Sequence, residues 1–369
     1  MLEELKKYIK NEKNLSEEFI KNIKPNDKII LWGNGWALYW YCKFFKWKEI
    51  KPDFIIDKNI HYGQRFDIPI VSADYILENL NVEQCKFVIT APKYRDEIET
   101  DIINKFGNVQ IYSFEAEIYF AFIQDVESYR NYLLDNFIRI ESLYSILEDD
   151  KSKETLISFF KGRISGEQKF FIDCMIPNQY FPKDIKEMRE EYEIIVEAGS
   201  NDGKTLLEII EETKGKFKKI FCFEPDKECI VKLEEIIDKS NKPIQLIKKG
   251  VGNIVGKVYF KTDSKYGASR IVDEGNHDYF VDITTIDEEL EDVPINYIKM
   301  DIEGMELDCL KGAKKVITKY SPKLAICIYH KNEDILEIPE YLKGINPNYK
   351  FYLRHHNWGA TETVLYAHV

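Results

Sequence analysis

The sequence lacks a long apolar run, and this absence excludes one class of protein. A helix that spans a bilayer needs ~18 or more consecutive apolar residues, whereas the strongest apolar stretch here, residues 324–329, is one strand long. The first fifteen residues alternate charged side chains with Leu, Tyr and Ile, and they lack the apolar segment of a secretory signal. We therefore expect no membrane span, and a cytoplasmic location is the default.

The sequence also lacks an excess of positive charge. It has 52 Lys and Arg against 64 Asp and Glu, which gives a formal net charge of −12. Sequence-independent binding of nucleic acid needs clustered cations that displace phosphate counterions, so we do not expect a nucleic-acid partner. Hydrophobic residues make up 44% of the chain, which is enough to bury cores and excludes a globally disordered protein.

Paired cysteines are absent as well. The seven cysteines are an odd number, and none of them forms a CxxC pair. A zinc knuckle needs two such pairs, and most of these cysteines lie inside apolar runs such as KIFCFEP and LAICIYH. We interpret them as reduced thiols of a protein core.

The order of apolar runs indicates how the 369 residues are organised. Residues 1–115 alternate short apolar strands with helices, which is typical of a Rossmann-like parallel α/β domain. Residues 116–190 carry apolar side chains at helical spacing and are interpreted as a helical bridge. Alternation resumes over residues 191–369, where the last two strands are joined only by a loop. They should pair antiparallel, because a parallel pair needs a long crossover.

A glycine-containing turn follows the first strand of the C-terminal domain. It reads EAGSNDGKT from Glu197 to Thr205, and Gly199 and Gly203 can supply tight-turn conformations and let the backbone approach a ligand. The next helix offers free N–H groups at its start. Glu197 and Asp202 would repel a pyrophosphate but suit a ligand with ammonium and sulfonium groups, as in S-adenosylmethionine.

Two further motifs follow the ends of later strands. Glu224 in FEPD can accept hydrogen bonds from both hydroxyls of a ribose. The alternative is an acid that caps the next helix, but Asp226 suits that position better. Asp301 and Glu303 in IKMDIEGM follow another apolar strand, so they are expected at the carboxyl edge of the sheet, where α/β proteins bind ligands.

Six motifs in this order resemble one known family. They read VEAGSNDGKT, FEPD, TTIDEEL, IKMDIEGMELDCLKGA, LAICIYHKNEDILEIPEYL and KFYLRHHNWGATETVLYA. Over about residues 176–369 they resemble the FkbM family of S-adenosylmethionine-dependent O-methyltransferases. Ser200-Asn201 replaces the more usual Ala-containing turn, and Glu197 stands where Asp is common; both changes keep the polar chemistry.

The resemblance implies an α/β fold with a class I (Rossmann-like) methyltransferase domain and a seven-stranded sheet. It also implies methyl transfer from S-adenosylmethionine to a hydroxyl of a sugar, nucleotide sugar or glycan. The residues expected to bind the cofactor are Tyr180, Phe181, Glu197, Gly199, Ser200, Asp202, Gly203, Thr205, Glu224, Pro225, Asp226, Gly250, Val251 and Asp301.

Methyl transfer needs an aligned acceptor oxygen and a group that takes its proton. We expect His330, at the end of the strand at 324–329, to act as a neutral imidazole base, with Asp301 as the rival base or as the group that orients it. Asp301 and Glu303 could also hold a divalent metal, although no ligand spacing requires one. The expected substrate contacts are Arg270 in the polar loop 264–270 and His355, His356 and Asn357 in the loop before the last strand.

The N-terminal domain carries a partial dinucleotide fingerprint. Gly33 and Gly35 follow the first strand and Asp57 the second, but Leu38 stands where the third glycine belongs. We prefer a scaffold or a dimer contact, compatible with a homo-oligomer, over nucleotide binding. Two alternatives to the leading hypothesis stay open: an NAD(P)-dependent nucleotide-sugar enzyme that uses this fingerprint, and a non-catalytic methyltransferase-like scaffold.

Overall fold

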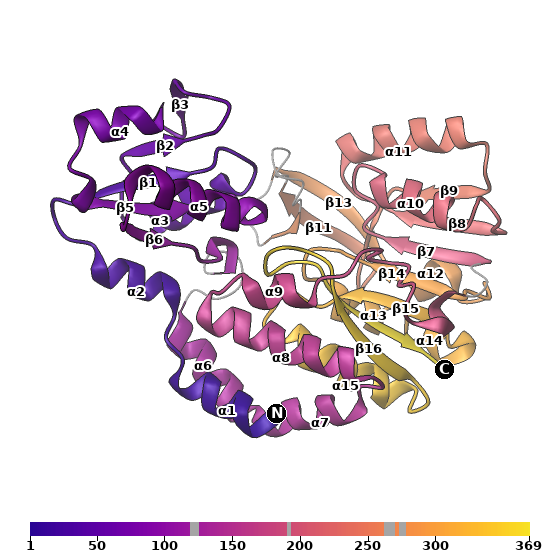
Figure 1. Cartoon of the computed structure of the whole chain (residues 1–369). Coiled ribbons are helices and arrows are strands. Elements are labelled where there is room, and N and C mark those ends of the chain that lie inside the picture. Colours follow the sequence, from indigo (N-terminus) through magenta and orange to yellow (C-terminus); the bar gives the residue numbers. More distant parts are fainter. Residues whose placement is uncertain (119–124, 190–192, 262–269, 273–277) are drawn as a thin grey trace. The chain divides into compact units, whose positions relative to one another are not determined.

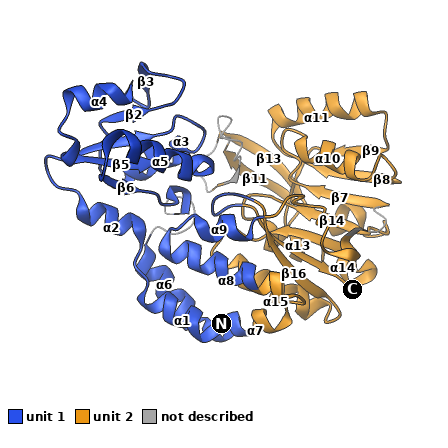
Figure 2. Cartoon of the chain, in the orientation of Figure 1, with its two compact units in different colours: residues 1–141, 154–175, 357–361 blue, residues 142–153, 176–356, 362–369 orange. Residues whose placement is uncertain are grey.

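A computed structural model describes residues 1–118, 125–189, 193–261, 270–272 and 278–369. These residues form two compact units (Figure 2). Unit 1 comprises residues 1–141, 154–175 and 357–361, and unit 2 comprises residues 142–153, 176–356 and 362–369. The stretch expected to be a separate helical bridge is therefore divided between the two units. Within the described residues, every helix is too short or too polar to cross a membrane.

Unit 1 is built on a six-stranded sheet with the order β3-β4-β2-β1-β5-β6 (Figure 1). All neighbours pair parallel except β3 and β4. Its strands are β1 (Lys28–Trp32), β2 (Phe54–Ile56), β3 (Gly63–Arg65), β4 (Ile68–Val71), β5 (Cys85–Ile89) and β6 (Gln110–Tyr112). Strand β5 is buried along its whole length, as expected for a parallel strand covered on both faces.

The helices of unit 1 begin with two short ones before the sheet. Asn14 caps the second of these, because its side chain accepts from the N–H groups of Ser16 and Glu17. The helices are α1 (Leu2–Asn11), α2 (Leu15–Asn22), α3 (Leu38–Trp47), α4 (Ala73–Asn79), α5 (Arg95–Phe106), α6 (Val126–Asp135) and α9 (Lys169–Cys174). Helices α7 (Phe137–Ile146) and α8 (Asp150–Ser165) contribute residues to both units.

Unit 2 contains the expected seven-stranded sheet, with the order β16-β17-β15-β14-β7-β8-β9. Strand β17 pairs antiparallel with both β15 and β16, and the other neighbours pair parallel. The predicted closing hairpin is thereby confirmed. The strands are β7 (Ile194–Ala198), β8 (Lys219–Phe223), β9 (Ile244–Ile247), β14 (Tyr297–Met300), β15 (Lys323–Cys327), β16 (Lys350–His355) and β17 (Thr363–His368).

The helices of unit 2 follow its parallel strands. They are α10 (Lys204–Glu212), α11 (Lys227–Ser240), α12 (Ile286–Leu290), α13 (Glu306–Lys311), α14 (Lys314–Tyr320) and α15 (Asp334–Ile345). Helices α13 and α14 follow each other closely and are separated at Gly312 and Ala313. A Cβ atom on Gly312 would lie 2.0 Å from the Gly252 carbonyl oxygen, so the close approach of another main chain explains the interruption.

A second, four-stranded sheet in unit 2 was not predicted. Its order is β10-β13-β11-β12, and its strands are β10 (Gly250–Val251), β11 (Gly256–Lys261), β12 (Arg270–Ile271) and β13 (Tyr279–Thr284). The sequence indicated only the strand at residues 257–261. Strand β13 escaped notice because it is only partly buried, so its apolar residues do not form a continuous run.

Candidate active site

The carboxyl ends of four parallel strands place the predicted motifs at one edge of the unit 2 sheet. Strands β8, β7, β14 and β15 are consecutive neighbours. Glu197 lies near the end of β7, while Glu224, Asp301 and His330 come after β8, β14 and β15. This is the edge at which open α/β sheets bind ligands.

Gly199 connects the predicted cofactor turn to the end of β14. Its φ angle is +81°, and a Cβ atom there would lie 1.9 Å from the Asp301 carbonyl oxygen. A side chain is therefore excluded by both the backbone conformation and the packing. We expect this glycine to let a ligand approach, and the structure adds that it lets the turn pack against Asp301.

Glu197 lies beneath the turn and is completely buried. Its Oε2 atom accepts hydrogen bonds from Ser200 Oγ at 2.9 Å and from Cys222 Sγ at 3.3 Å. Its Oε1 atom is buried and has no hydrogen-bond partner among the described residues. Burial raises the pKa of Glu197, and the charge of Lys299 opposes this rise. The unpartnered oxygen shows that the carboxylate retains hydrogen-bonding capacity.

Glu224 is almost fully buried and holds two main-chain groups. Its Oε2 accepts from the N–H of Asn201 at 2.7 Å, and its Oε1 accepts from the N–H of Asp226 at 2.9 Å. Burial raises the pKa of Glu224 to about 7, against the lowering effect of these hydrogen bonds. Asp226 caps α11 as expected, because its side chain accepts from the N–H groups of Glu228 and Cys229.

The other residues expected to bind the cofactor lie around this turn. Asp202 is exposed, Thr205 is half-buried in the first turn of α10, and Gly203 is buried at the start of that helix. Gly250 and Val251 form β10, and an ideal Cβ on Gly250 would lie 3.8 Å from Pro225 Cγ. The structure thus brings the strand-end motifs of β7 and β8 together with β10.

Asp301, Glu303 and His330 form a cluster at the end of β14 and β15. His330 Nε2 lies 3.5 Å from Asp301 Oδ1 and 3.7 Å from Glu303 Oε2, and its Nδ1 lies 2.9 Å from Glu306 Oε1. Burial alone would lower the pKa of His330, but the three carboxylates outweigh it and raise the pKa to about 10. Burial likewise opposes the effect of Lys299 and His330 on Asp301, whose pKa is lowered overall.

This electrostatic environment changes the interpretation of His330. The sequence predicted a neutral imidazole, whereas the surrounding carboxylates favour the charged imidazolium. Glu303 reaches the cluster from a backbone with φ +55°, a conformation that is uncommon for residues other than glycine. The carboxylates of Asp301 and Glu303 are therefore the basic groups of the cluster.

Tyr180 contacts the same cluster from the segment that precedes the sheet. Its hydroxyl donates to Asp301 Oδ2 at 2.7 Å, and its carbonyl oxygen accepts from the hydroxyl of Tyr297. Phe181 stacks on the Tyr297 ring with centroids 5.7 Å apart. Tyr180 is 3% exposed, so its hydroxyl orients Asp301 from inside the protein.

Three residues of this edge were missed by sequence reasoning. Lys299, 1% exposed, lies on β14 opposite Glu197 and donates from Nζ to the Gly199 carbonyl oxygen at 2.7 Å. The hydroxyl of Tyr329 lies 3.3 Å from both Asp301 Oδ1 and Glu362 Oε1. The signal for Lys299 was present, since a lysine inside a short apolar strand must find a buried partner.

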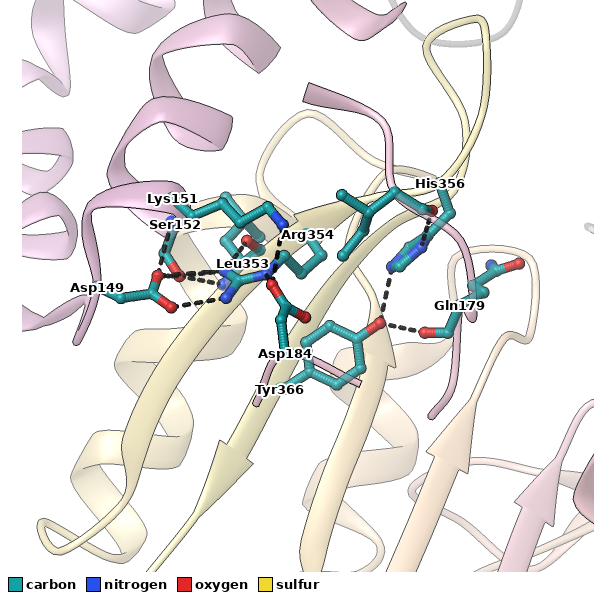
Figure 3. A network of polar contacts seen from close by, with 10 residues as sticks. Asp149, Lys151, Ser152, Gln179, Asp184, Leu353, Arg354, His356 and Tyr366 are labelled. Atoms are coloured by element: carbon teal, nitrogen blue, oxygen red, sulfur yellow. Dashed lines mark hydrogen bonds and ion pairs between the residues drawn. The ribbon is translucent and has the colours of Figure 1, made fainter. Parts of the chain in front are cut away.

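The expected substrate contacts of the C-terminal hairpin have other partners in the structure (Figure 3). His355 is the last residue of β16, and its Nδ1 lies 2.9 Å from Thr363 Oγ1. His356 Nδ1 lies 2.9 Å from the Ile176 carbonyl oxygen and its Nε2 lies 2.7 Å from the hydroxyl of Tyr366. Burial lowers the pKa of His356 to about 4, so the ring is neutral and holds the chain before Tyr180.

The remaining two expected substrate residues give no support to such a role. Asn357 belongs to unit 1, where its side chain donates to Thr361 Oγ1 at 2.5 Å and accepts from the N–H of Trp358 at 2.7 Å. Arg270 begins β12, but its side chain and most of the loop at 264–270 lie outside the described residues.

The partial fingerprint of unit 1 forms a similar turn. Asn34 donates its N–H to Asp57 Oδ2 at 3.1 Å, much as Asn201 does to Glu224 in unit 2. Arg65 Nη1 donates to the Asn34 side-chain oxygen at 3.0 Å and also to its carbonyl oxygen. In unit 1 the Arg65 guanidinium is therefore hydrogen-bonded to the polar atoms of the turn.

Comparison with known proteins agrees with this geometry. Residues 185–351 match the family described as the Methyltransferase FkbM domain. The solved structure of a methyltransferase FkbM from Methylobacillus flagellatus KT is similar with a TM-score of 0.73 and 22% identity, over 96% of this chain and 93% of that chain. This likeness confirms the predicted fold class.

Other solved structures are more distant. An rRNA methylase from Streptococcus thermophilus has a TM-score of 0.32 at 16% identity, over 48% of this chain and 87% of that chain. A putative methyltransferase from Streptococcus mutans in complex with SAH has a TM-score of 0.30 at 16% identity, over 49% and 90%. Curated proteins gave no match. The family match shows that residues 185–351 are similar to the FkbM methyltransferase domain.

Proposed function

We propose that this chain is an S-adenosylmethionine-dependent O-methyltransferase that acts on a hydroxyl of a sugar, nucleotide sugar or glycan. One observation carries the proposal: the Asp301 carbonyl oxygen occupies the space beside Gly199, while the Asp301 side chain belongs to the cluster with His330. Asp301 thus connects the proposed cofactor turn, through its carbonyl oxygen, with the proposed proton-accepting cluster, through its side chain.

The residues of the turn fit the proposed cofactor. Glu197 offers a buried oxygen without a hydrogen-bond partner among the described residues, and this carboxylate suits an ammonium group. Each Glu224 oxygen already accepts one main-chain N–H, and its remaining lone pairs suit the two hydroxyls of a ribose. S-adenosylmethionine supplies a methyl group that its sulfonium makes electrophilic.

The chain's own residues would orient the acceptor and take its proton. The Glu303 side chain is 39% exposed while that of His330 is 7% exposed, so Glu303 marks the open side of the cluster. An acceptor hydroxyl that enters there would meet the carboxylates of Asp301 and Glu303. With His330 in its charged form, one of these carboxylates receives the proton, and the imidazolium holds the pair together.

Calorimetry with the full chain tests cofactor binding directly, with S-adenosylmethionine and NAD(P)H titrated in parallel. We expect heat from the methyl donor alone. Glu197→Gln should weaken this binding by at least tenfold, because it removes the buried charge. Glu193→Gln is the matched control, since that acid precedes the same strand but is only half-buried and pairs with Lys218. Folded protein that gives no heat with S-adenosylmethionine would refute the proposal.

Transfer of a labelled methyl group to a panel of sugars and nucleotide sugars tests the reaction. Asp301→Asn should abolish turnover. His330→Ala should also abolish it while leaving the affinity for S-adenosylmethionine near that of the wild type. Turnover retained in His330→Ala would show that the imidazolium is not needed to hold the carboxylates, and turnover retained in Asp301→Asn would leave Glu303 as the base.

A further inference from the structure

The Nε2 atom of the His330 imidazole is buried between two carboxylates. The side chain is 7% exposed, and Nε2 has no hydrogen-bond partner among the described residues. This nitrogen points between two carboxylates, with Asp301 Oδ1 at 3.5 Å and Glu303 Oε2 at 3.7 Å. Nε2 is therefore close to both oxygens but hydrogen-bonded to neither.

Each carboxylate oxygen lies close enough to His330 Nε2 to share one ion with it. First-row divalent metals hold nitrogen and oxygen ligands at about 2.0–2.2 Å, so adjacent ligands of one ion lie roughly 3.0–3.6 Å apart. The separations of 3.5 and 3.7 Å from Nε2 are close to this requirement. The Asp301 and Glu303 oxygens do not come within 4.8 Å of each other around this nitrogen, so the Glu303 side chain, which is 39% exposed, must move towards Asp301 when an ion binds. One imidazole and two carboxylates are a donor set that Mn²⁺ accepts.

A third carboxylate, that of Glu306, lies at the other nitrogen of the imidazole, Nδ1. Glu306 is completely buried, and its Oε1 accepts from the Ile302 N–H at 2.8 Å and lies 2.9 Å from His330 Nδ1. Imidazoles that ligate metals usually present their other nitrogen to a carboxylate in this way, which fixes the ring and the tautomer. Tyr180 restrains Asp301 by donating to its Oδ2 at 2.7 Å.

We propose that Asp301, Glu303 and His330 bind a divalent cation, with Glu306 as the residue that positions the imidazole. The cation takes the place of the proton on His330 Nε2, so in the ion-bound protein the cation, and not an imidazolium, holds the two carboxylates together. It faces the open side of the cluster, where a hydroxyl of the acceptor would complete its coordination. This role in the reaction rests on the proposed function, whereas binding of the ion does not.

Another set of atoms in the same region could compete for the ion. Asp301, Cys327 and Glu362 bring their ligand atoms within 4.8 Å of one another, as do Asp301, Glu306 and His330. Cys327 is fully buried and contacts the hydroxyl of Tyr180. This set lacks an imidazole, so the nitrogen ligand distinguishes the two sites.

Titration of the chelator-treated full chain with Mn²⁺, without S-adenosylmethionine, tests the site. We expect one bound ion per chain and an imidazole nitrogen coupling in its pulsed electron paramagnetic resonance spectrum. His330→Gln and Glu303→Gln should weaken binding by at least tenfold, and Glu306→Gln by about 10–100-fold. Asp308→Asn is the control, because Asp308 lies on α13 like Glu306 but pairs with exposed Lys311. This variant should bind Mn²⁺ like the wild type.

Several results would overturn the proposal. Folded wild-type protein that binds no Mn²⁺ at millimolar concentration would do so, as would binding without nitrogen coupling. Binding that survives His330→Gln but is lost in Glu362→Gln would move the ion to the competing set. Since the titration does not depend on methyl transfer, Mn²⁺ binding without any binding of S-adenosylmethionine would refute the proposed function and leave the metal site intact.

Discussion

Replacing Arg354 with methionine should destabilise unit 2 strongly, although Arg354 lies outside the predicted catalytic cluster. Its side chain is 1% exposed and clamps two carboxylates (Figure 3). Nε donates to Asp184 Oδ2 at 2.9 Å, and Nη2 donates to Asp149 Oδ2 at 2.6 Å. Nη1 also donates to Ser152 Oγ at 2.8 Å. The clamp joins β16 to the segments before α8 and after Tyr180.

The expected loss is about 3 kcal/mol. Removing one partner of a buried ion pair costs roughly 3–5 kcal/mol, because a charge is left without compensation. The side chains of Asp149 and Asp184 are 36% and 35% exposed, so water can replace part of the lost interaction, and the lower end of this range applies. Lys151→Met is the matched control. It removes an exposed pair with the same Asp184 and should cost at most about 1 kcal/mol.

Urea unfolding of the full chain gives the free energies, and hydrogen exchange of β16 and β17 assigns the change to unit 2, because two units need not unfold in one transition. Asp149→Asn and Asp184→Asn added to Arg354→Met should recover much of the lost stability, since the neutral amides leave no uncompensated charge. The reasoning is refuted if Arg354→Met costs no more than Lys151→Met, or if the triple variant is no more stable than the single one.

Three further predictions follow from individual contacts. Wild-type stability should fall as the pH drops from about 6.5 towards 4, because unfolding lets the buried neutral His356 take up a proton; in His356→Gln, urea titrations across this range should show a flatter profile. Tyr180→Phe should lower kcat about tenfold, since it removes a hydrogen bond to the charged Asp301. A binding constant for S-adenosylmethionine within twofold of that of the wild type would show that the loss of kcat does not come from weaker cofactor binding. Gly199→Ala should cost about 1–3 kcal/mol, because it combines a positive φ with a clash, whereas Gly344→Ala, inside α15 with open space around it, should stabilise the chain by up to about 1 kcal/mol in thermal unfolding.

The parallel strands and the closing hairpin of unit 2 could be predicted because their physical causes are local. Apolar runs separated by amphipathic helices predict parallel strands, and the short loop between the last two strands requires an antiparallel pair. The second sheet was not predictable in the same way. Strand β13 is only half covered, so its apolar side chains are interrupted and resemble a loop.

The candidate site was predictable where a residue follows directly after a strand. Asp301 and His330 are in this position, and the structure brings them within 3.5 Å of each other. Glu362 was not predictable, because it reaches Tyr329 only through the pairing of β17 with β15. The charge state of His330 was also beyond the sequence, since it depends on three carboxylates that meet only in the folded chain.

The two units show why the glycine fingerprint alone does not assign a function. In both, an acid after the second strand accepts the N–H of an asparagine in the turn, so the acid at this spacing has a structural role whether or not a ribose binds. In unit 1, Arg65 occupies the polar atoms of that turn, which favours the scaffold interpretation over a nicotinamide cofactor. In unit 2 the turn instead packs on Asp301, and beneath it lies a buried oxygen of Glu197 that has no partner in the part of the chain that the structure describes. The difference between the units therefore lies in the side chains that contact the turn, Arg65 in unit 1 and Asp301 and Glu197 in unit 2. The proposal of methyl transfer rests on Asp301 and Glu197 and not on the glycines.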